Sequence, residues 1–294
     1  MIDQMFLMDI IELMKKELVR RHYSGRTVES YSFCVKKFLL WLGEKEPRRI
    51  TKRDVKDYLG WLCERKLAAS TLNLSLQALK FALENVLNKR FFVNIPYSKV
   101  PKRLPEVLTQ SEVVKLFSAI ENPKHSLMVR LMYSAGLRVS ELVNLRVKDI
   151  EFDLSYGWVR KGKGSKDRLF VLSEKIKQEL ADFIEFNGLA AHNHVFRSKD
   201  GCSHLTTRTV YAVVRKASAL AGLGKRVHPH TLRHSFATHL IENGNDLVRV
   251  QSIMGHASPD TTMVYVHMAS PALVSVKSPY DNLFCQARGT LRNI

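Results

Sequence analysis

The sequence predicts a mainly α-helical protein of two domains, the second of which also contains a small antiparallel β-sheet. Three observations support this prediction. Residues 1–90 repeat apolar side chains at helical spacing. Residues 93–105 then carry three prolines without any periodicity, which is typical of a linker. Helical spacing returns afterwards and gives way at residues 150–172 to a pattern typical of strands.

The first domain, residues 1–92, is predicted to be a bundle of four or five short helices. Ser24 and the glycine after it separate the first two helices, and Thr51 is a typical N-cap for the third. A fourth helix is predicted to begin at Ala69. Lysine and arginine occupy the outer faces, so we expect the apolar stripes to pack against one another.

The second domain is predicted to span residues 106–294, after a linker at 93–105 and with a C-terminal tail from about residue 268. Its first helices lead to two strand-like runs, residues 158–160 and 168–172. The glycine-bearing loop between these runs predicts a β-hairpin. Helical spacing resumes after the hairpin, so this domain is expected to be helical around one small sheet.

The segment 228–267 gathers polar residues in a mostly helical region. His230 and Arg233 are three positions apart, so they share one face of the first predicted helix. His256 follows the glycine that ends the second predicted helix. Tyr265 lies nine positions after His256, about two turns into a third. These side chains are therefore expected to lie close together.

The net charge of the chain is +18 and predicts a polyanionic partner. Residues 1–104 hold 21 basic and 11 acidic side chains, a net of +10. Residues 105–294 hold 25 and 17, a net of +8. Because both parts are basic, each is expected to hold phosphates, and nucleic acid is the partner that this charge favours.

The cysteines and the apolar runs narrow the class of protein further. The four cysteines are widely spaced and include no CxxC pair. This pattern argues against a zinc site and against a disulfide framework. No apolar run approaches the roughly 20 residues that a membrane span needs. We therefore expect a cytoplasmic protein. Because no carboxylate cluster suited to magnesium lies beside the 228–267 segment, we expect neither a metal nor another cofactor.

Four motifs, in their order and spacing, resemble those of the tyrosine recombinases. They are AGLRVSEL at 135–142, the GKG loop around Lys163, HTLRH at 230–234, and MGH at 254–256 with Tyr265 nine residues after its histidine. The resemblance covers almost the whole chain and is nearest to the Xer-type site-specific recombinases. It implies a helical, SAM-like, core-binding DNA-binding domain followed by a catalytic domain.

The resemblance implies that three residues hold the phosphate which is cut. Arg138 and Arg233 match the two arginines that bind its non-bridging oxygens, and His256 matches a histidine that hydrogen-bonds to it. The residues themselves support this chemistry, because a guanidinium donates two parallel hydrogen bonds to a planar anion. Taken singly, Arg138 is typical of a surface or capping arginine, and only the combination of motifs favours a catalytic role.

Three further residues are implied to move protons or to form a bond. Tyr265 matches the nucleophile, His230 the histidine that assists its proton transfer, and Lys163 the lysine that protonates the leaving 5′ oxygen. Tyrosine needs such help because its ordinary pKa is about 10. Lys161 and Lys166 share the loop of Lys163 and are alternatives for its role.

The resemblance also implies the partners. We expect double-stranded DNA with a specific recombination site and a homo-oligomer, a tetramer in the synaptic complex, with a helper protein as a further possible partner. The apolar tail is expected to dock either on its own subunit or on a neighbour. Within the recombinases, resolution of chromosome or plasmid dimers is the first interpretation, and a phage, plasmid or integron integrase is the alternative. A type IB topoisomerase and a DNA-binding protein without catalysis are the more distant rivals.

Overall fold

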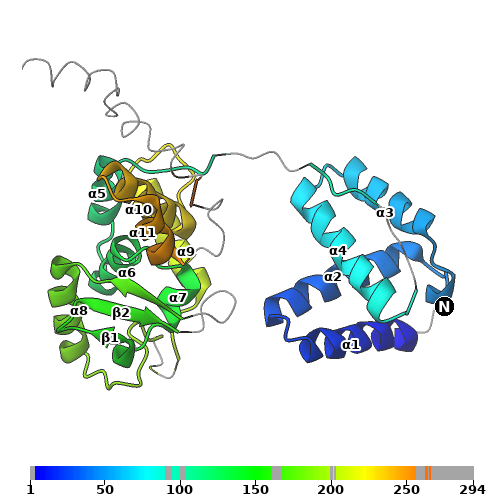
Figure 1. The fold of residues 1–294 in the computed structure, drawn as a ribbon, viewed down its shortest axis with the longest axis horizontal. Helices are drawn as coiled ribbons and strands as arrows, with labels where there is room; N and C mark the ends of the chain where they lie inside the picture. The colour runs from blue at the N-terminus through cyan, green and yellow to red at the C-terminus, as the bar shows by residue number, and fades with distance from the viewer. Residues whose placement is uncertain are drawn as a thin grey trace, which may run out of the picture. The chain divides into compact units, whose positions relative to one another are not determined.

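The computed structural model describes residues 4–89, 95–99, 104–160, 167–198, 201, 203–255, 262–263 and 265. The chain divides into two compact units, Met1–Lys102 and Arg103–Ile294. Within the described residues, eleven α-helices and one three-stranded sheet are present (Figure 1). The predicted fold class, mainly α-helical with a small antiparallel sheet in the second part, is therefore confirmed.

The first unit is a helical bundle whose helix starts follow the sequence signals. Ser24 accepts a hydrogen bond from the backbone of Thr27, and Thr51 and Asp54 form a reciprocal capping box. The fourth helix begins without a side-chain cap. The elements of this unit are α1 (Gln4–Arg20), α2 (Gly25–Leu42), the 3-10 turn η1 (Pro47–Arg49), α3 (Lys52–Glu64) and α4 (Ala69–Asn85).

Aromatic and aliphatic side chains from all four helices form the core of the first unit. Tyr58 of α3 packs edge-on against Phe38 of α2, with ring centroids 5.1 Å apart. Met14 of α1 and Leu79 of α4 are also fully buried. The apolar stripe of each amphipathic helix therefore faces the others, and this burial drives the bundle together.

The second unit contains seven further helices and the sheet. Its helices are α5 (Gln110–Ser118), α6 (Pro123–Ser134), α7 (Val139–Asn144), α8 (Glu174–Phe186), α9 (Thr207–Leu220), α10 (Pro229–Glu242) and α11 (Leu247–Met254), with the 3-10 turn η2 (Val147–Asp149) after α7. Helix α6 contacts five of the others, namely α5, α7, α8, α9 and α10. It is therefore the central helix of the unit.

The sheet is antiparallel in the order β1-β2-β3. Its strands are β1 (Ile150–Glu151), β2 (Tyr156–Val159) and β3 (Arg168–Val171). The predicted hairpin is thus present, and β1 extends it by a short third strand. Gly157 of β2 leaves room for the buried ring of Phe170, because a Cβ at Gly157 would lie 2.3 Å from the end of that ring.

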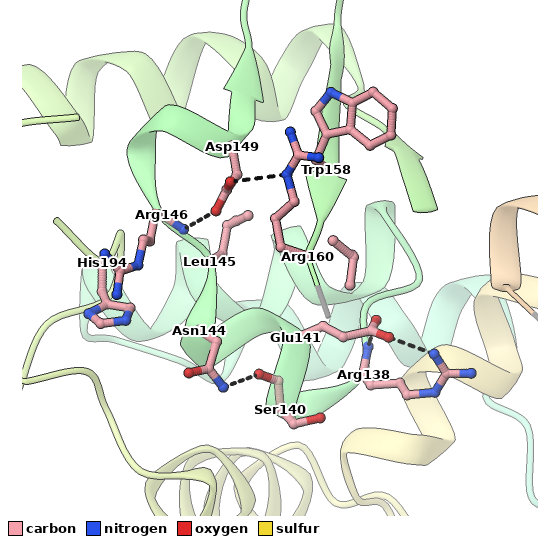
Figure 2. A pocket seen from close by; sticks show the side chains of 11 residues that line it. Arg138, Ser140, Glu141, Asn144, Leu145, Arg146, Asp149, Trp158, Arg160 and His194 are labelled. Atoms are coloured by element: carbon pink, nitrogen blue, oxygen red, sulfur yellow. Dashed lines mark hydrogen bonds and ion pairs between the residues drawn. The ribbon is translucent and has the colours of Figure 1, made fainter. Parts of the chain in front are cut away.

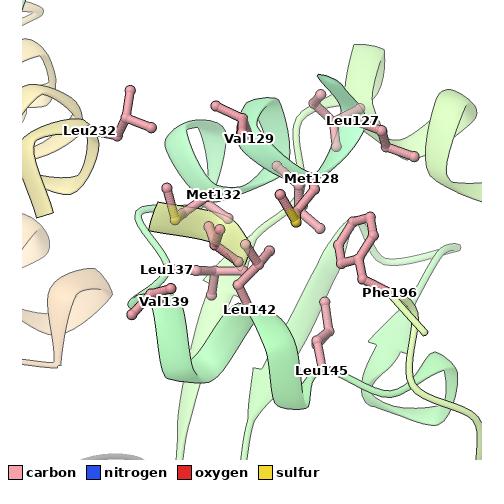
Figure 3. Packing of buried hydrophobic residues seen from close by; sticks show 14 of the residues in the cluster. Leu127, Met128, Val129, Met132, Leu137, Val139, Leu142, Leu145, Phe196 and Leu232 are labelled. Carbon is pink, nitrogen blue, oxygen red and sulfur yellow. The ribbon is translucent and has the colours of Figure 1, made fainter. Parts of the chain in front are cut away.

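The core beneath α6 fixes the positions of α7 and α10. Met128 and Met132 of α6 are fully buried in one cluster with Leu142 of α7 (Figure 3). Leu232 of α10 belongs to the same cluster. Phe196 closes the cluster from the segment that follows α8. Because this core is densely packed, the polar residues at the starts of α7 and α10 are held in fixed places.

Candidate active site

A tight turn between α6 and α7 presents the first arginine. Gly136 adopts φ +58°, and a Cβ there would lie 2.4 Å from the Phe236 ring, so the turn requires glycine. The backbone N–H of Leu137 bonds back to the carbonyl of Met132, which closes the end of α6. Arg138 then lies at the N-cap position of α7.

Glu141 binds the arginine that the turn presents. Its Oε2 accepts the backbone N–H of Arg138 at 2.9 Å, and its Oε1 accepts the Arg138 Nη1 at 2.5 Å (Figure 2). Oε2 also accepts Arg168 Nη2 at 2.7 Å and lies 3.8 Å from Arg233 Nη1. One carboxylate with a 4% exposed side chain therefore orients three guanidinium groups.

The charges around Glu141 keep it ionised. Burial by itself raises the pKa of this carboxyl group, but the charge of Arg168 and the hydrogen bonds and charge of Arg138 outweigh it and lower the pKa below its ordinary value. A carboxylate at the centre of three cations reduces their mutual repulsion, and it still leaves the cluster with a net positive charge.

Arg233 of α10 is the second arginine of the predicted pair. Its side chain is 4% exposed and donates from Nη1 to the carbonyl of Gly136 and from Nη2 to that of Met254. Burial, followed by the charge of Arg138, lowers the pKa of Arg233 to about 9, so it stays protonated at neutral pH. Each Nη atom carries a second N–H, so these two bonds use only part of its donor capacity.

Arg138 and Arg233 meet the same end of α11. Arg138 Nη2 lies 3.5 Å from the carbonyl of Gly255, the residue after the Met254 that accepts Arg233. Gly255 ends α11 in the left-handed conformation, with φ +60°. The structure therefore brings Arg138 and Arg233, the two arginines that the resemblance pairs, to the same end of α11.

Tyr265 lies beside this cluster and is buried. Its exposed fraction is 2%, and it packs with Ala237, Val250 and Met254. Burial raises the pKa of its phenol, and the charges of Arg233 and, less strongly, Arg138 oppose this effect. The hydroxyl is 3.0 Å from Nδ1 of His234.

His230 lies one helical turn before His234 on α10. Burial lowers the pKa of His230, and the nearby His228 and Arg233 lower it further. It is therefore neutral near pH 7 and has one ring nitrogen available as a proton acceptor. The rings of His228 and His230 are 6.1 Å apart and nearly perpendicular.

Two of the six predicted residues, Lys163 and His256, lie outside the described residues. The C-terminal tail from about residue 268 lies outside them as well. Within the described part of the chain, no group of three or more His, Cys, Asp or Glu side chains is placed to hold a metal ion. In the same part of the chain, no helix is long and apolar enough to cross a membrane.

Arg168 is a part of the site that the sequence did not single out. It begins β3, its side chain is 9% exposed, and besides Glu141 it bonds to the carbonyl of Ile253 at 2.6 Å. A Cβ on Gly255 would lie 2.5 Å from Arg168 Cδ, so the glycine also makes room for this side chain. One feature of the sequence could have indicated this role. Arg168 begins a strand that was expected to be half-buried, and a buried charge requires a partner of opposite charge.

A cavity of about 610 Å³ opens from Arg138 along α7 and β2. Arg146, Arg160 and His194 line its other end (Figure 2). Asp149 accepts the backbone N–H of Arg146 at 3.2 Å and pairs with Arg160 at 3.7 Å. The cavity therefore offers more basic than acidic side chains next to the arginine cluster.

A helical unit, a second unit with a small sheet, and one buried and one half-buried arginine beside a buried tyrosine are the features expected of an enzyme that cuts and rejoins DNA strands. Comparison with known families supports this class. Residues 106–271 match the phage integrase family, and residues 10–91 match the phage integrase N-terminal SAM-like domain. The chain therefore belongs to the phage integrase family and is a tyrosine recombinase, an enzyme of DNA recombination.

Relatives of known class are similar along most of their length. The tyrosine recombinase XerA of Pyrococcus horikoshii is 35% identical over 268 residues, 90% of this chain and 91% of that protein. An integrase/recombinase of Escherichia coli is 32% identical over 316 residues, 93% of this chain and 94% of that protein.

Solved structures show the same fold. The crystal structure of a XerA recombinase is 28% identical and covers 96% of this chain and 99% of its own, with a TM-score of 0.53. A XerH site-specific recombinase bound to its difH substrate before cleavage has a TM-score of 0.69 at 23% identity, over 90% of this chain and 85% of its own. This second similarity is one of fold.

Proposed function

We propose that the chain is a site-specific recombinase that cuts DNA with Tyr265 and resolves dimers of circular chromosomes or plasmids. The observation that supports the chemistry is the cluster of Arg138 and Arg233 around Glu141, close enough to Tyr265 for both charges to affect its pKa. The tyrosine recombinase XerA of Pyrococcus horikoshii, which aligns over 90% of the chain, supports the biological role.

In this proposal Arg138 and Arg233 hold the two non-bridging oxygens of the scissile phosphate. The negative charge on these oxygens grows in the transition state, so donors that are already oriented stabilise it without reorganising. Glu141 orients Arg138 and lies between the two guanidinium groups. Loss of one such donor in comparable sites lowers the rate by about 10²–10³. His256, which is outside the described residues, is assigned a further bond to the phosphate.

The reaction is a transesterification with two proton transfers, and the proposal assigns a residue to each of them. The oxygen of Tyr265 bonds to phosphorus as the 5′ oxygen of the next nucleotide leaves. His230, which is neutral near pH 7, takes the phenolic proton. Lys163 gives a proton to the leaving oxygen. The 3′-phosphotyrosine keeps the energy of the broken bond, so a new 5′-hydroxyl rejoins the strand in the reverse reaction without ATP or a cofactor.

The domain organisation follows from the same proposal. Residues 1–92 and the catalytic domain at 106–294 hold one duplex, with residues 93–105 as the linker, and their basic side chains bind its phosphates. Four subunits on two copies of the site exchange strands in pairs, and a helper protein is a candidate regulator. Because the substrate is chromosomal or plasmid DNA, we place the reaction in the cytoplasm.

An integrase is the second candidate, and the Escherichia coli integrase/recombinase relative favours it. The two roles differ in the pairs of sites that are joined. A dimer-resolving enzyme acts on two identical sites within one circle, whereas an integrase joins two different sites on separate molecules. Supplying both kinds of substrate to the purified chain and sequencing the junctions decides between them.

The test of the chemistry is the Tyr265→Phe variant. The probe is a labelled, nicked duplex that carries the sequence selected by the chain from a random duplex library, called the selected duplex below. We expect the unsubstituted chain to form a protein–DNA adduct that survives denaturation, and Tyr265→Phe to form none while it binds the duplex with unchanged affinity. Tyr211→Phe, which changes an exposed tyrosine of the same unit, is the matched control and should form the adduct. An adduct with Tyr265→Phe would remove Tyr265 as the nucleophile.

A further inference from the structure

The tyrosine hydroxyl contacts a histidine that lies one turn away from the one assigned to proton transfer. His230 and His234 are four residues apart on α10, which is about 6 Å along the helix axis. Tyr265 Oη lies 3.0 Å from Nδ1 of His234, and the two rings are tilted with centroids 5.6 Å apart. The hydroxyl is therefore engaged with His234 rather than presented to a ligand.

Burial leads to the same conclusion. A nucleophile must approach phosphorus to about 3–3.5 Å. Tyr265 is only 2% exposed, and Ala237, Val250 and Met254 surround it. Because so little of this residue is accessible, a solvated DNA phosphate has little access to it, and the tyrosine must move before it can attack.

We propose that His234 is a positioning residue that holds Tyr265 in a resting position, so that the hydroxyl must exchange His234 for the scissile phosphate before a strand is cut. This inference rests on the proposed role of Tyr265 as the nucleophile. It goes further because it assigns a role to His234, the last residue of the HTLRH motif, to which the resemblance gave none, and it predicts that breaking this contact accelerates cleavage.

The electrostatics make this contact a hydrogen bond between two neutral groups. Burial, followed by the charges of His230, His228 and Arg233, lowers the pKa of His234 to about 4. Burial raises the pKa of Tyr265. At pH 7 the phenol therefore keeps its proton and shares a hydrogen bond with an uncharged imidazole ring, and it does not become a phenolate while it stays there. The resting position thus keeps the phenol protonated and also fixes its location.

A second histidine–tyrosine pair on the same helix provides a matched control. His239 Nδ1 lies 2.8 Å from the hydroxyl of Tyr133, and its ring is also buried. Each contact joins a histidine Nδ1 to a tyrosine hydroxyl, but Tyr133 has no proposed part in cleavage. Removing each contact in turn separates an effect on the nucleophile from the loss of any buried hydrogen bond on α10.

The experiment measures single-turnover adduct formation on the selected duplex with protein in excess. His234→Phe keeps a ring in place but removes the nitrogen that makes the hydrogen bond. We expect the maximal rate of adduct formation to rise about fivefold, which corresponds to ~1 kcal/mol, while the concentration for half-saturation is unchanged. His234→Asn restores an amide acceptor close to the Nδ1 position and should return the rate toward that of the unsubstituted chain. His239→Phe should leave the rate unchanged.

The outcomes are distinct. A maximal rate that falls or stays the same in His234→Phe, with the variant folded and binding DNA normally, overturns the inference, because His234 then either assists the attack or does not restrain it. An adduct in Tyr265→Phe overturns the proposed function instead, whatever the His234 variants do.

A measurement on the unsubstituted chain keeps the inference testable even where a variant fails to fold. Nitration of tyrosines with tetranitromethane, followed by mass spectrometry, compares Tyr265 with two internal references. Tyr58 is 1% exposed and Tyr97 is 53% exposed. We expect Tyr265 without DNA to react as slowly as Tyr58. Reaction as fast as that of Tyr97 would contradict a resting position in which the ring is enclosed.

Discussion

Glu141 shows how much of the site depends on one side chain. Its carboxylate joins Arg138, Arg168 and Arg233, which come from α7, β3 and α10. A glutamate three positions after an arginine has many ordinary explanations, and its sequence position alone does not single it out. The partners that make it central are contributed by other elements, so only the folded chain shows why the carboxylate is needed.

Replacing this carboxylate with an amide tests its part in stability. Glu141→Gln keeps the shape but leaves three buried or half-buried guanidinium groups without their anion. We expect the free energy of unfolding at pH 7 to fall by about 3–5 kcal/mol, measured by urea denaturation. Glu179→Gln is the matched control, because Glu179 accepts Arg130 at 2.7 Å with a side chain that is 39% exposed. The control should lose no more than about 1 kcal/mol, and equal losses would contradict the central role of Glu141.

We also expect the difference in stability between the unsubstituted chain and Glu141→Gln to depend on pH. The pKa of Glu141 is lower in the folded chain than in the unfolded chain. Its contribution to stability is therefore complete above about pH 4.3, the ordinary pKa of glutamate, and is lost as the pH falls through the lower folded value. The difference in unfolding free energy between the unsubstituted chain and Glu141→Gln should shrink over that acidic range. A difference that is constant with pH would show that the amide acts through packing alone.

At the scale of elements, turns position the chemistry more than helices do. The turn at Gly136 ends α6, starts α7 at Arg138 and offers its own carbonyl to Arg233. A left-handed glycine next to an aromatic ring is a position that glycine alone fits. The sequence indicates a turn there, but the Phe236 ring that restricts it belongs to α10, a hundred residues further on.

Gly136→Ala tests this turn against a glycine of the same backbone conformation. Gly222 has φ +63° and open space around it, whereas Gly136 has φ +58° and faces the Phe236 ring. We expect Gly222→Ala to lower the free energy of unfolding by about 1–2 kcal/mol through backbone strain alone. Gly136→Ala should lose about 1–3 kcal/mol more from the clash, and its rate of adduct formation should fall because the partner of Arg233 moves. Equal losses in urea denaturation would show that Phe236 adapts freely.

The whole molecule is expected to bind DNA largely through charge. The net charge is +18, and both parts of the chain are basic. A protein that neutralises six to ten phosphates loses about 10³–10⁵ in affinity between 50 and 200 mM salt, because condensed counterions are released on binding. We expect fluorescence titrations to show a loss of affinity for the selected duplex within this range. A scrambled duplex should bind more weakly, with a similar dependence of affinity on salt concentration. A flat salt dependence would contradict phosphate contacts as the main source of affinity.

Much of the architecture was predictable because its signals are local. Periodicity predicted the helices of both units, and caps such as Thr51 and Thr109 mark helix starts through hydrogen bonds three residues away. The hairpin followed from its glycine loop and flanking runs. The third strand, β1, was missed, because two residues are too short to show an alternating pattern.

The sequence by itself determined most of the elements through local periodicity and caps, and the order and spacing of its motifs determined the family and proposed the six candidate residues. Tertiary structure decided what those residues contact. Arg233 bonds to a carbonyl 97 positions away, and Tyr265 meets His234 across 31 positions. Such partners depend on how α6 packs against α7 and α10. The sequence near each residue does not show which distant polar atoms this packing brings into contact with it.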